Sequence, residues 1–340
     1  MMNTYRAVQA SAPGVLELVY RPRPVPGPIE VLIEVEACGI CGADSGDINS
    51  KRDVPRVPGH EVIGRITEVG TSVPTMWKVG MRVGVGRLGG HCNDCSVCRQ
   101  GLFQLCPNQQ FVGSSCDGGY AEMMLARSTG LVAIPAELSS VEAAPLLCAG
   151  LATFNAMRKS GALAGDVVAI QGIGGLGHLA VQYARKMGFR VIAVGRGRDI
   201  ADDVSALGAH RYIDSNVEDP VKALLGLGGA QLILTTITDS DAVSALAPAL
   251  APKGKLLLVG VGKSPLAISP GLLVLGERSI EGSITGTPCD AERTLDFSVM
   301  ANVRPSIETM PLSRAREAYE RMTSGKAHFR MVITMGEREA

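Results

Sequence analysis

The sequence has no excess of charge of either sign. Among its 340 residues, 33 lysines and arginines balance 33 aspartates and glutamates. A protein that attracts nucleic acid or an anionic membrane through its overall field carries a clear positive excess. The composition therefore excludes recognition of this kind, and we expect a small-molecule substrate, no nucleic-acid partner and no membrane.

Long apolar runs are also absent. No stretch reaches the roughly 18 uninterrupted apolar residues that a membrane span needs, and the opening MMNTYR shows no apolar run behind a basic head. The nine cysteines are an odd number, and several are too densely packed for a disulfide framework in a chain of this length. We expect a cytoplasmic protein whose clustered cysteines bind metal.

Two sequence textures predict two domains. Up to about residue 150, β-like runs at residues 31–36, 62–69 and 82–86 are separated by glycines and prolines, which is typical of an irregular, mostly β domain. Beyond it, strand and helix patterns alternate as in a doubly wound parallel sheet, so the fold class is α/β. The strands are expected at residues 167–171, 190–194, 212–214, 232–237, 255–261 and 279–285, with helices at 176–187 and 200–207. From residue 291 the pattern predicts a helix, a proline-containing break, a second helix and a closing strand at 330–334.

The run CNDCSVCRQGLFQLC places four cysteines at intervals of three, three and eight: Cys92, Cys95, Cys98 and Cys106. Four thiolates at such spacings can close a tetrahedron around Zn²⁺ and leave no position for substrate. The pattern favours a structural zinc in a lobe over about residues 88–110. Four unrelated buried thiols and an iron–sulfur cluster remain alternatives.

A second motif, QGIGGLGH, stands between an apolar strand and an amphipathic helix. Its glycines suit a tight turn, close approach to a pyrophosphate and close packing of helix on strand, while the helix N-terminus supplies amide donors. We predict a dinucleotide site formed by Gly172, Ile173, Gly174, Gly175, Leu176 and Gly177.

The end of the next strand bears on which dinucleotide is bound. Gly195 stands where an acidic residue would accept the ribose hydroxyl of NAD, and Arg196 and Arg198 follow. Guanidinium groups attract the 2′-phosphate of NADP, and charge-assisted hydrogen bonds contribute about 1.5–3 kcal/mol. We predict a preference for NADP(H). If Arg196 stacks on adenine and Arg198 is only a surface charge, NAD(H) remains usable.

Two thiolates and an imidazole are offered at long separations by Cys41, by His60 in the run GHE, and by Cys148 in LLCAG. Two cysteines and one histidine with an open fourth position are typical of a catalytic zinc. Each residue alone is more often ordinary packing, so the interpretation depends on the combination. We expect the remaining cysteines, Cys38, Cys116 and Cys289, to be buried as small apolar side chains.

In this order, the trio, the four-cysteine run and the GIGGLG motif resemble the zinc-containing medium-chain alcohol dehydrogenases over essentially the whole chain. The resemblance implies a GroES-like catalytic domain at residues 1–150 that holds two zinc ions and a Rossmann domain at 151–287. It also implies a return of residues 288–340 to the first domain, an alcohol or aldehyde substrate, and a homodimer or homotetramer.

The resemblance also implies roles for individual residues. Cys41, His60 and Cys148 match the catalytic zinc ligands, and Glu61 matches an acid that can replace water during ligand exchange. Asp44 matches the carboxylate that orients the histidine ligand, which would fix its tautomer and raise its basicity. A turn cap is the alternative role for Asp44.

Three positions depart from the family pattern. Ala43 stands where relatives carry the serine or threonine that passes the alcohol proton toward solvent. Ala152 replaces a threonine beside the nicotinamide, for which the adjacent Thr153 could compensate. Arg87 lies near the position of an aromatic wall of the alcohol pocket: pointing inward it would favour a carboxylate or phosphate on the substrate, and pointing outward it would be a solvated charge.

We therefore predict a zinc-dependent oxidoreductase that transfers hydride between NADP(H) and an alcohol or aldehyde and favours aldehyde reduction. Losing general acid–base assistance costs about 10²–10⁴-fold on the step that needs it. For this reason, an NADPH-dependent reductase of conjugated double bonds or iminium ions is a second hypothesis. A weakly catalytic regulatory protein that binds zinc and dinucleotide is a third.

Overall fold

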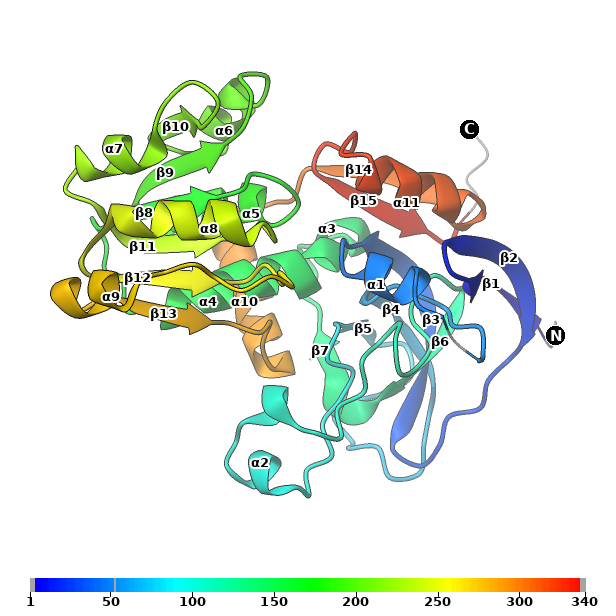
Figure 1. The fold of residues 1–340 in the computed structure, drawn as a ribbon. Coiled ribbons are helices and arrows are strands. Elements are labelled where there is room, and N and C mark those ends of the chain that lie inside the picture. Colours follow the sequence, from blue (N-terminus) through cyan, green and yellow to red (C-terminus); the bar gives the residue numbers. More distant parts are fainter. Residues whose placement is uncertain (1–3, 52, 337–340) are drawn as a thin grey trace. The chain divides into compact units, whose positions relative to one another are not determined.

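The structure is a computed structural model that describes residues 4–51 and 53–336. The chain folds into two units, one made of Met1–Cys148 with Gly286–Ala340 and the other of Ala149–Thr285. Their elements are labelled in Figure 1. The unit limits fall two residues before the domain limits expected from the sequence, at 148/149 instead of 150/151 and at 285/286 instead of 287/288.

The first unit is mostly β, as expected. Its main sheet has the order β14-β15-β3-β4-β5-β7, with β6 paired to β3, and β1 and β2 form a separate hairpin. The pairs are antiparallel except β14 with β15, so the sheet is mixed. The strands are β1 (Thr4–Ala12), β2 (Val15–Pro22), β3 (Glu30–Ile40), β4 (Glu61–Val69), β5 (Arg82–Val85), β6 (Met123–Arg127), β7 (Leu131–Ala133), β14 (Ile307–Pro311) and β15 (Arg330–Thr334).

The helices of this unit are mostly short because prolines and glycines interrupt the chain between its strands. They are α1 (Asp44–Ile48), α2 (Ser96–Arg99), η1 (Phe103–Leu105), η2 (Ser128–Gly130), α3 (Ser140–Pro145), α10 (Pro288–Met300), η5 (Leu312–Arg314) and α11 (Ala315–Thr323). A π-helical segment, η3 (Leu146–Gly150), continues from α3 and reaches the boundary with the second unit.

The second unit is a parallel sheet of six strands in the order β10-β9-β8-β11-β12-β13. This is the strand order of dinucleotide-binding folds, and it reverses between β8 and β11. The elements are α4 (Leu151–Lys159), β8 (Val167–Gln171), α5 (Gly177–Lys186), β9 (Arg190–Gly195), α6 (Ala201–Ala206), β10 (Arg211–Asp214), α7 (Pro220–Leu225), β11 (Ala230–Thr235), α8 (Ser240–Leu246), η4 (Ala247–Ala249), β12 (Leu250–Leu258), α9 (Pro270–Gly276) and β13 (Ser279–Gly282).

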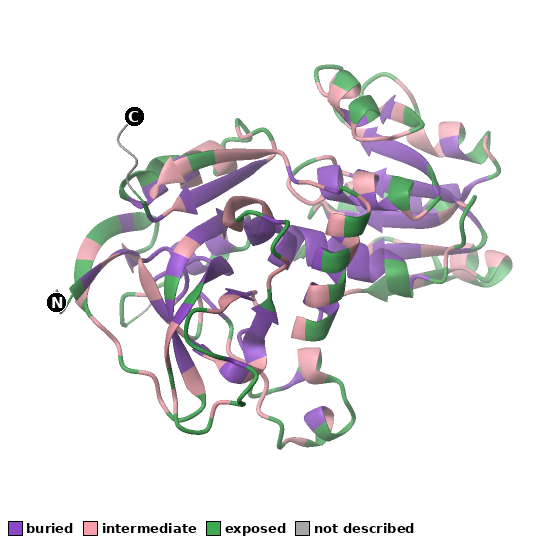
Figure 2. Cartoon of the chain, turned by 180° about the vertical axis from the view of Figure 1, so that it is seen from behind, coloured by how far each residue is buried: buried purple, intermediate pink, exposed green. Residues whose placement is uncertain are grey.

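The α/β prediction is thus confirmed: the first unit has a mixed sheet and the second a parallel Rossmann-like sheet. Each sheet has an apolar core of its own. Figure 2 shows buried residues along the strands of the parallel sheet. None of the helices in the described part of the chain has the length and apolar character that crossing a bilayer requires.

Some element limits differ from the sequence prediction. β12 ends at Leu258 instead of residue 261, and β13 ends at Gly282 instead of residue 285. A Cβ on Gly260 would come within 2.2 Å of the Ile237 carbonyl oxygen, so the chain turns there against a neighbouring loop. The apolar run continues beyond the strand because its last residues line a cavity. β14 is a further strand, at a place where the sequence predicts only a break.

Candidate metal and dinucleotide sites

Three segments of the first unit bring together Cys41, His60, Glu61 and Cys148. Cys41 follows the end of β3, His60 and Glu61 stand at the start of β4, and Cys148 lies in η3. The antiparallel register pairs Gly39 with Glu61, so the end of β3 lies beside the start of β4. A Cβ on Gly39 would come within 1.9 Å of Glu61 Oε2, so only glycine leaves room for this buried carboxylate.

These four side chains form a buried cluster whose ligand-type atoms all lie within 4.8 Å of one another. The Sγ atoms of Cys41 and Cys148 are 3.8 Å apart. A Zn–S bond of about 2.3 Å in tetrahedral geometry separates two sulfurs by about 3.8 Å, whereas a disulfide needs about 2.05 Å. The separation therefore fits two thiolates on one metal ion.

One ring nitrogen of His60 has a hydrogen-bond partner, and the other has none. Its Nδ1 lies 2.8 Å from Asp44 Oδ1, and both side chains are fully buried. Its Nε2 is buried without a hydrogen-bond partner. A buried imidazole nitrogen that finds no donor or acceptor costs free energy unless it binds something else. The donor set thus fits a zinc ion at Cys41, His60 and Cys148.

Asp44 makes both of the contacts that the sequence left open. Oδ2 accepts the Cys41 backbone N–H at 2.9 Å, which is a local turn contact, while Oδ1 faces His60. Burial by itself would lower the pKa of His60, but the Asp44 carboxylate outweighs it and the pKa is raised well above its usual range. The hydrogen bond shared with Cys148 lowers the pKa of Cys41 well below its ordinary value.

Glu61 forms a buried ion pair with Arg330 of β15. Burial raises the pKa of Glu61 to about 7, although Arg330 opposes the shift. Glu61 Oε2 has no hydrogen-bond partner. Removing either member of a buried ion pair leaves an uncompensated charge, which costs about 3–5 kcal/mol. Arg330 therefore holds a carboxylate beside the cluster and leaves one of its oxygens free for a ligand.

The second cluster consists of the four cysteines of the lobe. Their Sγ separations include 3.6 Å for Cys92 to Cys106, 3.9 Å for Cys95 to Cys106 and 4.0 Å for Cys92 to Cys98. These values bracket the separation expected around tetrahedral zinc. The backbone N–H groups of Cys95 and Cys98 donate to the sulfurs of Cys92 and Cys95. The lobe therefore fits a closed four-thiolate site.

In the second unit, the glycine-rich turn joins β8 to α5. Gly172 has φ +90°, which side chains rarely adopt, and a Cβ on Gly177 would come within 1.9 Å of the Gly172 carbonyl oxygen. A Cβ on Gly174 would meet nothing within 4 Å. The turn is thus closed on itself at its ends, while open space remains beside Gly174 at the N-terminus of α5, where an anion can approach.

Arg196 and Arg198 follow β9 and are exposed, and neither has a partner among the described residues. Gly197 between them has φ +89° and donates its N–H to Asp214 Oδ1 at 2.9 Å. A Cβ on Gly195 would come within 2.9 Å of the Tyr212 hydroxyl. This loop is therefore held through its backbone, which leaves both guanidinium groups free for a ligand.

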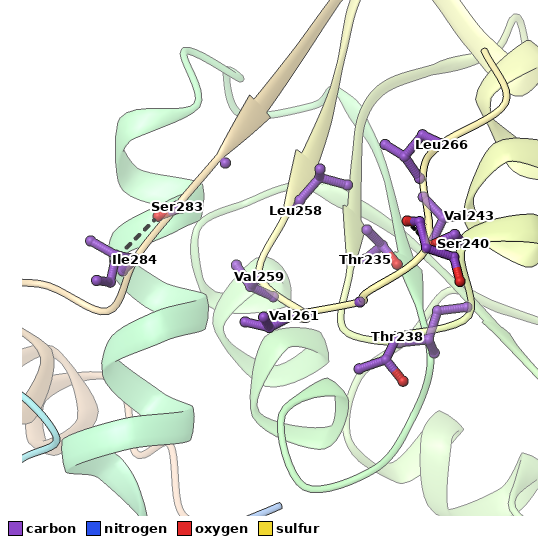
Figure 3. Close-up of a pocket in the computed structure, with 15 residues that line it drawn as sticks. Thr235, Thr238, Ser240, Val243, Leu258, Val259, Val261, Leu266, Ser283 and Ile284 are labelled. Carbon is purple, nitrogen blue, oxygen red and sulfur yellow. Dashed lines mark hydrogen bonds between the residues drawn. The ribbon is translucent and has the colours of Figure 1, made fainter. Parts of the chain in front are cut away.

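A cavity of about 440 Å³ lies at the carboxyl ends of β11, β12 and β13. Figure 3 shows Thr235 and Thr238 on one side, Val259 and Val261 from the loop after β12, and Ile284 beyond β13. Ligands of open α/β sheets bind outside the carboxyl ends of the strands. No motif in the sequence marks these residues as a site, and the apolar run that continues past β12 is their sequence signal.

The three departures from the family pattern can now be placed. Ala43 is exposed and precedes α1. Ala152 is buried in α4, and the hydroxyl of the adjacent Thr153 donates to the Ala149 carbonyl oxygen of η3 at 2.7 Å. The Arg87 guanidinium pairs with the buried carboxylate of Asp47 and donates to the Val112 carbonyl oxygen at 3.0 Å. The Arg87 guanidinium is therefore directed at a carboxylate inside the protein, which neutralises its charge.

Sequence reasoning did not select Tyr120, Asp47 or Arg330, whose partners lie 76, 40 and 269 residues away in the chain. The expectation that the remaining cysteines are buried holds for Cys38, but Cys116 is half-buried. For Cys289, which is exposed, the expectation was wrong. Cys289 follows the proline at the start of α10, a position on a helix surface that apolar patterning does not mark.

Comparisons with known proteins agree with this architecture. Residues 27–136 match the alcohol dehydrogenase GroES-like domain, and residues 175–300 match the zinc-binding dehydrogenase domain. Alcohol dehydrogenase notN of Aspergillus sp. (strain MF297-2) is 44% identical over 92% of this chain and 93% of its own length. Aldehyde reductase AdhA of Synechocystis sp. (strain ATCC 27184 / PCC 6803 / Kazusa) is 33% identical over 98% of this chain and 99% of its own.

Among solved structures, CAD from Helicobacter pylori complexed with NADP(H) superposes with a TM-score of 0.87 at 28% identity, covering 99% of both chains. The fold and the two domain matches define a zinc-binding dehydrogenase. The chain belongs to the zinc-containing alcohol dehydrogenase family of medium-chain dehydrogenases and reductases, and it is an oxidoreductase of that family.

Proposed function

We propose that this oxidoreductase binds two zinc ions per chain, one in each cluster, and reduces aldehydes with NADPH in preference to NADH. The observation that carries the catalytic assignment is the buried Nε2 of His60, which has no partner and belongs to the same cluster as two sulfurs 3.8 Å apart. Cys41, His60 and Cys148 would hold the catalytic ion, and Glu61 would enter its coordination during ligand exchange. Cys92, Cys95, Cys98 and Cys106 would hold the structural ion.

When bound, the two cofactors supply Lewis-acid polarisation of the carbonyl oxygen and a hydride for the carbonyl carbon. The chain's own residues orient them. Asp44 fixes the tautomer of His60, so that Nε2 carries the lone pair that a metal needs. Three zinc ligands leave a fourth position for the substrate oxygen. Because Ala43 has no hydroxyl, the proton that completes the alcohol would come from water or a ribose hydroxyl of the cofactor.

The NADP(H) preference is supported by the two free guanidinium groups after β9. The amide groups at the start of α5 would receive the pyrophosphate, with Gly174 leaving room for it. The cavity between β11 and β13 would receive the nicotinamide half, since it lies beyond the point where the strand order reverses. NADP(H) in complex with the Helicobacter pylori protein agrees with this assignment.

We expect the cofactor preference to depend on Arg196 and Arg198. Replacing both by alanine should weaken NADPH binding about 10- to 100-fold for each charge-assisted hydrogen bond lost, and leave NADH binding nearly unchanged. Arg190→Ala is the matched control because it removes an exposed arginine from the opposite end of β9. Equal binding of NADH and NADPH to the wild-type protein in a fluorescence titration would refute the preference.

We also propose that the protein forms homo-oligomers through the second unit. β13 is the last strand of its sheet, and its far edge has no strand partner within the described residues. On α9, Val274 is 74% and Leu275 90% exposed. An unprotected sheet edge beside large exposed apolar side chains is typical of an interface. Light scattering on the purified protein should give a dimer or tetramer, and Leu275→Glu should shift it toward the monomer.

The reaction itself is tested by product analysis. The zinc-replete protein is incubated with NADPH and cinnamaldehyde, and the products are separated by chromatography. We expect cinnamyl alcohol, formed by addition of hydride to the carbonyl carbon and a proton to the oxygen. The absence of turnover from a protein that contains both zinc ions and binds NADPH would favour the regulatory hypothesis.

A second candidate, conjugate reduction, is favoured by Ala43. Hydride addition to the β-carbon requires no proton relay at the substrate oxygen, so the missing hydroxyl would cost little. A proton from water would then add to the α-carbon and complete the product, the saturated aldehyde. Ala43→Ser separates the two functions: a rise in alcohol oxidation at unchanged zinc content identifies the missing hydroxyl as the limit, and no rise counts against carbonyl chemistry as the main activity.

A further inference from the structure

We infer that Tyr120 is a positioning residue for the metal cluster and acts on His60 through Asp44. This inference rests on the proposed zinc site. The Tyr120 hydroxyl donates to Asp44 Oδ2 at 2.9 Å, and both side chains are fully buried. The other oxygen of the same carboxylate faces His60 Nδ1 at 2.8 Å. A continuous chain of hydrogen bonds thus runs from a phenol to the imidazole.

The Tyr120 ring is fixed by its backbone. Residues 118–120 run alongside residues 57–59 through three hydrogen bonds: Gly118 N–H to the Val57 carbonyl at 2.7 Å, Gly119 N–H to Gly59 at 2.9 Å, and Tyr120 N–H to Pro58 at 3.0 Å. A Cβ on Gly118 would come within 2.1 Å of the Gly59 carbonyl oxygen, so glycine permits this approach. The segment that ends at Tyr120 therefore holds the residues directly before His60.

The ring also packs against the residue that precedes His60. Gly59 has φ +94°, and a Cβ there would come within 2.3 Å of Tyr120 Cδ1. Tyr120 thus contacts the backbone beside His60 and donates to the carboxylate that orients its ring. Burial, reinforced by Asp44, raises the pKa of Tyr120 well above its usual range, so the hydroxyl is a hydrogen-bond donor at neutral pH.

The Asp44 carboxylate accepts hydrogen bonds from three groups, shared between its two oxygens. One oxygen accepts from His60, and the other accepts from Cys41 N–H and from Tyr120. Without the phenol, one buried lone pair of Asp44 would lose its donor, and the carboxylate would be less well fixed. Outer partners of metal-ligating histidines contribute about 10–100-fold to metal affinity or activity. Tyr120 is one bond further out and one of three contacts, so we expect about 3- to 10-fold.

The test compares Tyr120→Phe with Tyr5→Phe. Tyr5 is also buried in the first unit, at 7% exposure, and its hydroxyl has no hydrogen bond among the described residues, so its variant controls for losing a buried phenol. Zinc release from the holoprotein to an excess of chelating dye is followed with time. We expect the catalytic zinc to leave Tyr120→Phe about 3- to 10-fold faster, with unchanged release from the four-cysteine lobe.

A second measurement reports on the geometry of the metal ligands through the absorption spectrum of a bound cobalt ion. With Co²⁺ at the catalytic site, the visible absorption of Tyr120→Phe should shift relative to wild type, and that of Tyr5→Phe should not. If Tyr120→Phe fails to fold, site-specific difluorotyrosine at position 120 keeps the ring and supplies a more acidic donor, so zinc release should become slower. Unchanged release and an unchanged cobalt spectrum would overturn the inference. A wild-type protein that holds only the lobe zinc would instead overturn the proposed function on which it rests.

Discussion

The two cysteine clusters of the first unit offer similar ligands but are built in different ways. The lobe takes all four sulfurs from one short segment, within 14 residues of one another, and two of its four cysteines are half-buried. The other cluster joins residues up to 107 positions apart, is buried, and lies against Asp44 and Arg330. The lobe can close around an ion by local folding alone. The buried cluster needs its sheet in place first, which suits it to holding a ligand set open.

Cys41→Ser should give the largest difference between the two clusters. We expect activity to fall at least about 10³-fold, because Lewis-acid polarisation of the substrate is lost. Zinc content should fall from two ions to one per chain, measured by elemental analysis beside turnover. Cys289→Ser, at an exposed position, is the control and should change neither. A variant that keeps both ions and its activity would contradict the assignment.

Cys95→Ser tests the four-cysteine lobe and should lower the thermal stability of the protein. Its sulfur accepts the Cys98 N–H and lies 3.9 Å from Cys106, so the lobe loses one thiolate and its closed geometry. We expect the midpoint of thermal unfolding to fall by at least about 5 °C, since each kcal/mol shifts it by about 2–4 °C in a domain of this size. Turnover at low temperature should stay near wild type. A loss of activity as large as that of Cys41→Ser would place the lobe in the chemistry.

Asp44→Asn isolates the charged outer partner of the buried cluster. An amide has about the same shape, but it cannot hold the imidazole N–H as a carboxylate does, and we expect catalytic zinc affinity or turnover to fall about 10–100-fold. Asp47→Asn removes another buried carboxylate from the same helix without touching His60, so its effect on zinc should be much smaller. Equal zinc loss in both variants would mean that α1 matters only as a structural element.

The same contrast between local and distant residues explains which features could be predicted from the sequence. The lobe spacing and the glycine motif are local patterns, and the fold class follows from alternating strands and helices. Cys41, His60 and Cys148 could be selected only as a combination, in an order that resembles a known family, because no short pattern joins residues so far apart. Tyr120 and Arg330 act through pairings of distant segments, so neither has a local signal. The pairing of Arg87 with Asp47 likewise joins the loop after β5 to α1, 40 residues away in the chain.

We expect the smallest effect from Asn108, an uncharged side chain that donates a hydrogen bond to a sulfur of the lobe. Its amide lies 3.4 Å from Cys92 Sγ, and this bond is the main reason that the pKa of Cys92 is lowered to about 6. Asn108→Ala should raise this pKa toward its ordinary value, so more of the thiol is protonated at neutral pH and zinc must displace a proton. In a Cys41→Ser background, which isolates the lobe site, zinc affinity near pH 7 should fall about 2- to 5-fold. The difference in zinc affinity between Asn108→Ala and its parent should vanish as the pH rises above the raised pKa, because Cys92 is then ionised in both proteins. Gln109→Ala, which removes a neighbouring amide that donates to the Phe103 carbonyl oxygen instead of to sulfur, should leave the zinc affinity unchanged at every pH.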